Sequence, residues 1–407
     1  MSILRGILGV AFILVLSYFI SNNKKAITKR IRSIILMFVL QLVITFISLR
    51  TSIGITVLGA ISDFFNWLMD QAISGVDFVF GGIVIEEGAT VFFLHVLLPL
   101  IFFAVLIAIL DYIKVLPFIM KWVGFIINKI TGAGELEGEF SISTTLLGQP
   151  AGYLTIAERI PKISSRRMFT LCLVATSTIG ANMLGAYMQI IPGEYVVVAV
   201  FLNIFSAFIV SSLINPYENE EEGIQEEVIG QETDETDNTV QEKDGNIFSV
   251  ISEAITNGFN LAIGVAASVI GFIALITFLN NSLDFFVGVT FTEVVGYIFS
   301  PIAYLIGIPI GDIIDAGGVM AIKLFTNELV GMGELADLVG TVTEKTYAML
   351  SVYLLSFANF GTLGIILGAL KSIDKKQATN ISRQSLKLLL GATISSLLTA
   401  TVVGMFF

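Results

Sequence analysis

The sequence IKLFTNELVG, residues 322–331, places Lys323, Asn327 and Glu328 in an apolar neighbourhood that indicates membrane depth. The segment does not have the pattern of a spanning helix. A carboxylate at that depth is costly unless it faces a partner or a water-filled cavity, so Glu328 is predicted to belong to a functional site. The alternative is a carboxylate in an interfacial loop, exposed to water.

A second interrupted stretch, SFANFGTLG, occupies residues 356–364. It puts small and polar residues into a segment that is otherwise apolar enough to cross a bilayer. The two stretches together predict a binding cavity between a re-entrant hairpin and a broken helix.

The composition of the chain excludes a soluble globule. Hydrophobic residues make up 55% of it, charged residues only 14%, and the mean hydropathy is +0.88. The lone Cys172 excludes a disulfide or a thiolate metal site, and the single His95 favours helix packing over metal binding. We therefore expect an all-α polytopic membrane protein without a resident cofactor.

The net charge of −11 is local, because residues 216–244 hold twelve acidic residues against Lys243. The acidity of the chain therefore says nothing about a substrate. A segment of this composition is typical of a disordered linker, which we assign to residues 215–246.

Hydropathy predicts eight membrane-spanning helices. Residues 1–90 would form N-terminal scaffold helices together with an interfacial helix over 52–80, where acidic residues alternate with apolar ones. The predicted spans are 6–21, 33–49, 91–110, 168–190, 195–214, 259–279, 347–370 and 388–407.

Basic residues predict the orientation, since cytoplasmic loops carry the excess of Lys and Arg. The basic segments 22–32, 114–167 and 371–383 alternate correctly if all three are cytoplasmic. Both termini would then lie outside the cell membrane, and the acidic linker inside.

Two parts of the chain repeat one order of elements. Residues 91–214 and 247–407 each contain a span, an amphipathic segment, a polar-interrupted hairpin (134–160 and 311–338), a broken span and a further span. Because each part crosses the membrane three times, the second must run inverted to the first. Inverted repeats with discontinuous helices are typical of secondary transporters, whose substrates bind where the repeats meet.

The motifs resemble those of the concentrative nucleoside transporters. The stretch TNELV, residues 326–330, is similar to the family's N-E-F-V-A, and SFANFGT, residues 356–362, is similar to its G-F-A-N-x-S-S. Supporting matches are Gly148-Gln149 in the first hairpin and Ile160-Pro161-Lys162 after it.

This resemblance implies a homotrimer whose protomers bind a nucleoside between two hairpins, driven by co-transported sodium or protons. By position, Glu328, Asn359 and Thr362 would bind the ribose hydroxyls, and Gln149 would contact the base. Phe357 and Met183 would line the pocket. A carboxylate and an amide suit a vicinal diol, because the first accepts two hydrogen bonds and the second donates and accepts.

The chain departs from the family pattern in the first hairpin. Pro150 and Ala151 stand where relatives carry a hydroxyl and a carboxylate, so base recognition is expected to be altered. The family's sodium ligands correspond to the Thr144 side chain, the Leu147 carbonyl, the Thr178 hydroxyl and the Ile179 carbonyl. Sodium-coupled members have asparagine at the position of Thr144, which leaves proton coupling open.

Three functions remain in competition. The first is a cation-coupled nucleoside symporter, and the second is a symporter for a modified nucleoside or another polyhydroxylated metabolite. The third is a non-transporting membrane receptor for such a ligand, which would need a signalling domain that the acidic linker is too polar to form. No nucleophile and base at matched positions indicate an enzyme, and no basic surface indicates a nucleic-acid partner.

Overall fold

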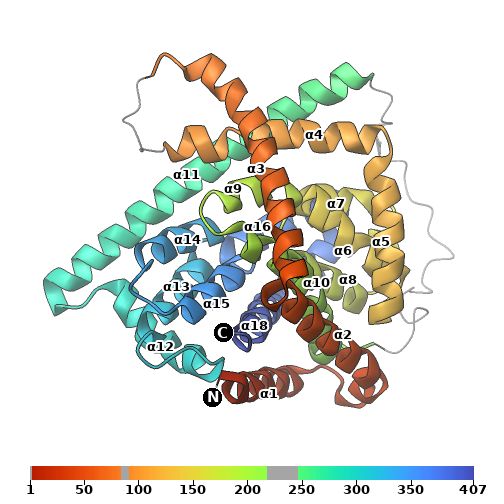
Figure 1. Cartoon of the computed structure of the whole chain (residues 1–407). Coiled ribbons are helices and arrows are strands. Elements are labelled where there is room, and N and C mark those ends of the chain that lie inside the picture. Colours follow the sequence, from red (N-terminus) through yellow and green to blue (C-terminus); the bar gives the residue numbers. More distant parts are fainter. Residues whose placement is uncertain (1, 84–90, 218–245) are drawn as a thin grey trace.

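The computed structural model describes residues 2–83, 91–217 and 246–407, and every element in these ranges is helical. Three long helices begin the chain, and polar caps fix where two of them start. The Asn23 side chain accepts a hydrogen bond from the Ala26 amide, and Thr51 does the same for Gly54. These helices are α1 (Ser2–Ile20), α2 (Lys24–Arg50) and α3 (Ser52–Phe80), of which α3 crosses the front of the molecule in Figure 1.

The first repeat follows the predicted order. A spanning segment is followed by the amphipathic helix, a helical hairpin, a broken helix and a second spanning helix. Its elements are η1 (Phe93–Leu97), α4 (Leu100–Tyr112), α5 (Val115–Thr131), α6 (Glu135–Leu147), α7 (Gln149–Thr155), η2 (Ile160–Lys162), α8 (Ser165–Ser177), η3 (Ala181–Met183), α9 (Leu184–Met188) and α10 (Gly193–Ile214).

The second repeat has the same order, so the all-α fold with two repeats, each with a hairpin and a broken helix, is confirmed. A short additional helix, α17, precedes its last spanning helix. The elements are α11 (Ile247–Val287), α12 (Phe291–Leu305), α13 (Ile313–Phe325), α14 (Glu328–Asp337), α15 (Glu344–Leu354), α16 (Phe360–Ile373), α17 (Lys375–Ser382) and α18 (Ser385–Gly404).

Within the described ranges, eight helices are long and apolar enough to cross a membrane, but they are not the predicted eight. The α3 helix, expected at the interface, qualifies by length and composition, and its interfacial position stays a prediction. The span predicted over 347–370, which the sequence indicated to be broken, consists of two helices, α15 and α16, each too short to cross a membrane alone. The span predicted over 259–279 is the middle of the 41-residue α11, about 60 Å long at the usual rise per residue.

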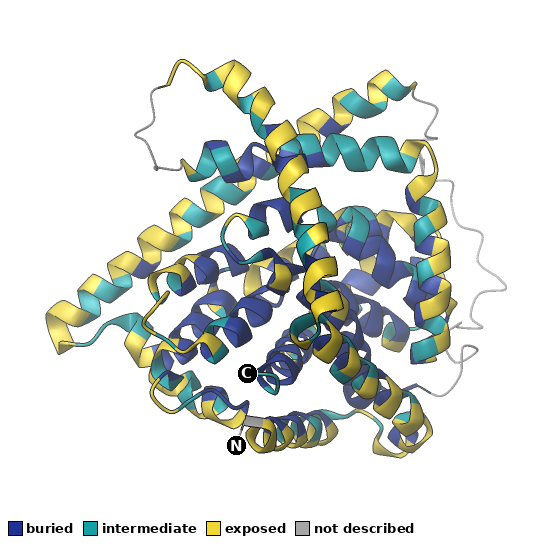
Figure 2. Ribbon diagram, viewed as in Figure 1, coloured by how far each residue is buried: buried dark blue, intermediate teal, exposed yellow. Residues whose placement is uncertain are grey.

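Burial divides these helices into an inner and an outer set. Figure 2 shows α8, α10, α15 and α18 buried at the centre, whereas α1, α2, α3 and α11 carry many exposed residues. Exposed side chains on α11 include Phe259, Ile270 and Phe278. Apolar residues on the outside of a chain with many spans are expected to face lipid or another copy.

Each hairpin packs against its amphipathic helix through a pair of glycines. A Cβ atom on Gly138 would lie 2.4 Å from the carbonyl oxygen of Gly124, which joins α6 to α5. In the second repeat, a Cβ atom on Gly317 would lie 2.4 Å from the carbonyl oxygen of Gly296, which joins α13 to α12. Only glycine permits this approach of two backbones, and both repeats use it at the same place.

The start of the predicted linker is ordered, contrary to expectation. Asn215 and Tyr217 are buried, and the Tyr217 hydroxyl donates a hydrogen bond of 2.8 Å to Glu137 Oε1. The composition of the segment does not indicate this order, because residues 215–217 are not acidic and their partners are distant in the sequence. The remainder of the predicted disordered segment, residues 218–245, lies outside the described residues.

Candidate functional site

The tip of the second hairpin presents Glu328 at the start of a helix. The α13 helix ends at Phe325, and the Asn327 side chain caps α14 by accepting a hydrogen bond of 3.0 Å from the Val330 amide. Glu328 is therefore the first residue of α14, and it is only 6% exposed. The free amides at a helix N-terminus favour a negative charge there.

Side chains from both repeats converge on this carboxylate. The Tyr187 hydroxyl, from α9, donates to Glu328 Oε1 over 2.8 Å, and Asn359 Nδ2 donates to Oε2 over 3.2 Å. Asn359 also caps α16, since its Oδ1 accepts from the Thr362 amide (2.8 Å) and hydroxyl (3.1 Å). The three residues predicted to bind ribose thus form one buried network.

The first hairpin turns at Gly148, whose φ of +83° favours glycine. Gln149 begins α7, and its Nε2 donates 2.7 Å to the Ala175 carbonyl of α8. Pro150 is exposed in the first turn of α7, where a helix needs no amide donor, and Ala151 is half-buried. The side-chain nitrogen of Gln149, the residue predicted to contact the base, is therefore engaged with the protein here.

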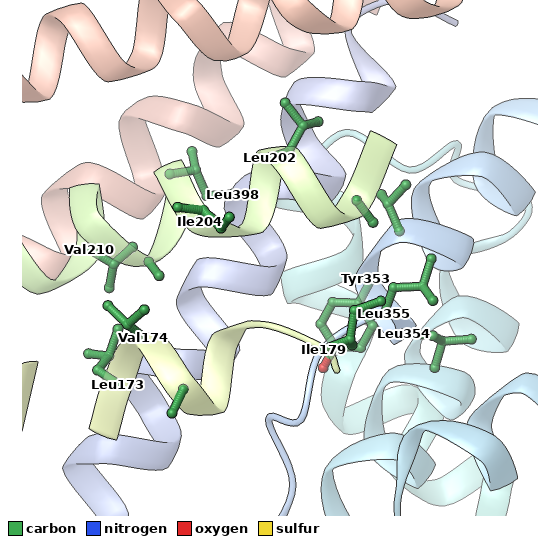
Figure 3. Packing of buried hydrophobic residues seen from close by; sticks show 14 of the residues in the cluster. Leu173, Val174, Ile179, Leu202, Ile204, Val210, Tyr353, Leu354, Leu355 and Leu398 are labelled. Atoms are coloured by element: carbon green, nitrogen blue, oxygen red, sulfur yellow. The ribbon is translucent and has the colours of Figure 1, made fainter. Parts of the chain in front are cut away.

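The two broken helices meet directly. The Phe357 amide, in the break between α15 and α16, donates 3.3 Å to the Thr178 carbonyl, in the break after α8. Figure 3 shows Ile179 of the first break beside Tyr353 and Leu354, at the end of α15, and Leu355, where the second break begins. The sequence predicted both breaks, and the structure places them against each other.

The oxygens predicted to bind a cation surround the first break and the first hairpin tip. A Cβ atom on Gly180 would lie 3.1 Å from the Gly148 Cα, so hairpin and break touch. Thr144 and Thr178 donate their hydroxyl hydrogens to carbonyls of their own helices, which leaves oxygen lone pairs for a cation. Leu147 ends α6, so its helix supplies no partner for its carbonyl.

Each hairpin is also anchored at its base by a buried carboxylate. Arg167 of α8 donates to both oxygens of Glu137, Nε over 2.6 Å and Nη2 over 2.9 Å. Asp312, before α13, accepts hydrogen bonds from the Thr343 and Thr346 hydroxyls (2.7 and 2.6 Å). Burial alone would raise the Asp312 pKa, but the hydrogen bonds from Thr346 and Thr343 outweigh it and hold this pKa below its usual value.

Two site residues had no predicted role, and a third, Asn182, was predicted only as an amide of the first helix break that helix packing explains poorly. The small residues beside Tyr187 predict only helix packing, and the sequence gives Lys323 only as a charge among apolar residues. Asn182 Oδ1 is buried and accepts no hydrogen bond from the described part of the chain, and it lies near the Gly148 turn. The dipeptide Ala-Asn occurs at 181–182 and again at 358–359, which pairs Asn182 with Asn359. Met183 is buried beside it and Phe357 is half-buried.

Comparison with known proteins places these features in a family. The model for the C-terminus of Na+-dependent nucleoside transporters matches residues 195–404, and the model for their N-terminus matches residues 8–83. The chain belongs to the Na+-dependent nucleoside transporter family. The concentrative nucleoside transporter resemblance and the expectation of a transporter rather than an enzyme are both confirmed.

Relatives in this family match the chain from end to end. The purine nucleoside transport protein NupG of Bacillus subtilis (strain 168) is 35% identical over 408 residues, with 100% of both chains covered. The nucleoside permease NupC of Helicobacter pylori (strain 26695) is 27% identical, with 100% of this chain and 98% of that protein covered.

Solved structures have the same architecture. CNTnw in an inward-facing substrate-bound state superimposes with a TM-score of 0.89 at 26% identity, covering 100% of this chain and 98% of the other. A variant of CNTnw in an outward-facing state gives a TM-score of 0.90 and covers 99% of that chain. The fold of the chain is therefore that of CNTnw.

Proposed function

We propose that this protein is a sodium-coupled symporter that imports nucleosides across the cytoplasmic membrane. One observation carries the proposal: the buried Glu328 carboxylate, where a hairpin tip meets both broken helices, is approached by Tyr187 and Asn359. Such a carboxylate at membrane depth marks a substrate pathway. The family assignment gives the class of substrate.

The Glu328 network supports ribose as the part of the substrate bound there. A carboxylate oxygen that accepts from the Tyr187 hydroxyl can equally accept from a ribose hydroxyl, and Asn359 can donate to the neighbouring one. In this proposal a nucleoside displaces Tyr187 from Glu328 when it binds. Thr362 contributes through the Asn359 cap.

The first hairpin supports a purine as the base. The relative NupG is named as a purine nucleoside transport protein, and Pro150 and Ala151 offer no side-chain hydrogen bond. The side-chain oxygen of Asn182, Oδ1, is buried near Gly148 and has no hydrogen-bond partner in the described residues. It supplies an acceptor in place of the missing side chains. We assign base recognition to Asn182 together with Gln149.

Sodium is the proposed coupling ion. Hard cations prefer oxygen ligands, and Thr144, Leu147, Thr178 and Ile179 bring hydroxyl and carbonyl oxygens to the first hairpin and break. The proposed membrane arrangement keeps both termini outside the cell. Apolar side chains exposed on α11 are available for contact between copies in a homotrimer.

Uptake into proteoliposomes tests the proposed function. Labelled inosine and uridine should accumulate above the external concentration when sodium is higher outside, and should only equilibrate when choline replaces sodium. Accumulation that follows a pH gradient and ignores sodium would overturn the coupling ion. Absence of uptake of every nucleoside by a correctly inserted protein would overturn the substrate class.

Thr178→Val is expected to raise the sodium concentration needed for half-maximal uptake roughly tenfold, since losing a ligand to a charged group costs about 1.5 kcal/mol. Valine replaces the hydroxyl with a methyl group of similar size. Initial uptake rates across a sodium titration measure the effect, and Thr178→Ser, which keeps the hydroxyl, is the control. An unchanged sodium dependence in Thr178→Val would exclude this residue as a ligand.

Asn182→Ala is expected to reduce discrimination between purine and pyrimidine nucleosides by roughly tenfold, because the acceptor that reads the base is removed. Competition of labelled inosine by inosine, guanosine, uridine and cytidine gives the ratio of affinities. Thr362→Val is the contrasting variant, and should weaken all four nucleosides alike. If the purine-to-pyrimidine ratio in Asn182→Ala equals that of the wild type, Asn182 does not face the base.

A further inference from the structure

Lys323 lies completely buried in α13, and all its partners belong to the second repeat. Its Nζ donates hydrogen bonds to the Tyr353 carbonyl (2.5 Å), to Ser356 Oγ (2.6 Å) and, at a longer distance, to Ser396 Oγ (3.5 Å). The same nitrogen lies 4.2 Å from the centroid of the Tyr353 ring. The nitrogen is thus surrounded by a carbonyl, two hydroxyls and a ring face.

The hydroxyl hydrogens around Lys323 point away from it. Ser396 Oγ donates 3.0 Å to the Ala392 carbonyl, which uses its single hydrogen. Ser356 Oγ and Ser396 Oγ are 2.6 Å apart, so the Ser356 hydrogen lies between them. Both serine oxygens are then acceptors toward Nζ, and with the Tyr353 carbonyl they match the three donors of an ammonium group. The ring face of Tyr353 also attracts a cation. The site is therefore built for a positive charge.

Lys323 corresponds by position to a residue of the proposed sodium site. It stands five residues before Glu328 at the second hairpin tip, as Thr144 stands five residues before Gln149 at the first. Its ligand Ser356 stands three residues before Asn359, as Ile179 stands three residues before Asn182. The second repeat thus sets a break oxygen against this hairpin position, and the proposed sodium site has break oxygens at the same position of the first hairpin.

From this correspondence we propose that the Lys323 ammonium is a built-in cation, which occupies in the second repeat the place that the coupling ion occupies in the first. The inference rests on the proposed sodium-coupled function for the role of the first site. A tethered ammonium never leaves, so the second hairpin stays joined to its broken helix without an ion from solution. The first site alone exchanges sodium during transport.

Shortening Lys323 turns this position into an open cation site. Lys323→Ala removes three methylenes and the ammonium, and n-propylammonium has the size and charge of the missing part. In detergent, the melting temperature of purified Lys323→Ala should fall by several degrees in choline chloride. It should recover in n-propylammonium chloride at equal ionic strength, and in part in sodium chloride. Lys121→Ala, at an exposed position of α5, is the control and should respond as the wild type does.

Lys323→Met tests whether this position needs a positive charge or only a side chain of similar volume. The methionine side chain refills the volume without a charge, so this variant should be destabilised and should not respond to n-propylammonium. If Lys323→Ala responds to n-propylammonium and sodium no more than the wild type does, the position is not a cation site. A Lys323→Met protein as stable as the wild type would show that the positive charge contributes nothing.

A flux measurement on the wild type covers the case in which neither variant folds. Labelled sodium and labelled inosine taken up together should give one sodium per nucleoside, and a ratio of two would overturn the built-in cation. The melting experiments need no nucleoside. A wild-type protein that transports no nucleoside would therefore refute the proposed function, while the response of Lys323→Ala would still test the cation site.

Discussion

Replacing Glu328 with glutamine is expected to abolish concentrative nucleoside uptake while leaving the protein folded. The change keeps the shape of the side chain but removes its charge, and hydrogen bonds to a charged group are worth about 1.5 to 3 kcal/mol each. Two such bonds reach Glu328 in the structure, one to each oxygen. In the proposed complex a ribose hydroxyl takes the place of Tyr187, and loss of that one charge-assisted hydrogen bond would lower affinity by roughly ten- to a hundredfold.

The structure offers a matched control for this substitution. Glu135 is the first residue of α6 as Glu328 is the first residue of α14, but it is exposed. Glu135→Gln should take up nucleosides at the wild-type rate. Initial uptake rates and direct inosine binding, with size-exclusion chromatography to confirm folding, measure both variants. Wild-type uptake by Glu328→Gln would end the assignment of this carboxylate to the ribose.

Replacing Arg167 with methionine is expected to lower the stability of the protein by roughly 3 to 5 kcal/mol, because it leaves the Glu137 carboxylate buried without its partner. Arg167 holds both oxygens of Glu137, whose side chain is fully buried. The remaining hydrogen bond, from the Tyr217 hydroxyl, is neutral and cannot replace a charge. The loss should be seen as an earlier thermal unfolding transition.

Two further variants show whether the charge is the cause. The double variant with Glu137→Gln and Arg167→Met removes both charges and should recover much of the stability. Arg159→Met breaks the exposed pair with Glu139 (3.4 Å) in the same hairpin and should cost at most about 1 kcal/mol. If Arg167→Met and Arg159→Met unfold at the same temperature, the buried pair does not anchor the hairpin.

The sequence was sufficient to predict the hairpins and the helix breaks. Polar residues such as Glu328 and Asn359 inside apolar segments have few physical explanations. The structure brings these two together where a hairpin tip meets a helix break. The sequence does not decide whether α3 crosses the membrane, because acidic residues in a long apolar helix fit either a membrane interface or a crossing. The break within 347–370 could be predicted, but not that it leaves two helices too short to span.

Contacts between distant segments could not be predicted. Nothing in the local sequence indicates that Tyr187 donates to Glu328, or that Lys323 reaches Ser356 and Ser396, since these pairs form only when the two hairpins and breaks pack together. The order of residues 215–217 was missed for the same reason. Composition describes an average over a segment, whereas burial of Tyr217 depends on one carboxylate in another helix.

The hydrogen bond from the Phe357 amide to the Thr178 carbonyl joins the helix breaks of the two repeats at one backbone contact. It joins backbone to backbone, so every substitution other than Phe357→Pro leaves its donor and acceptor in place. The unwound segments must therefore shift together or separate at this atom pair. A crosslink that holds residues 178 and 357 at their present separation should therefore leave transport intact if the two breaks travel as one body. The same crosslink should arrest the cycle if transport requires them to part.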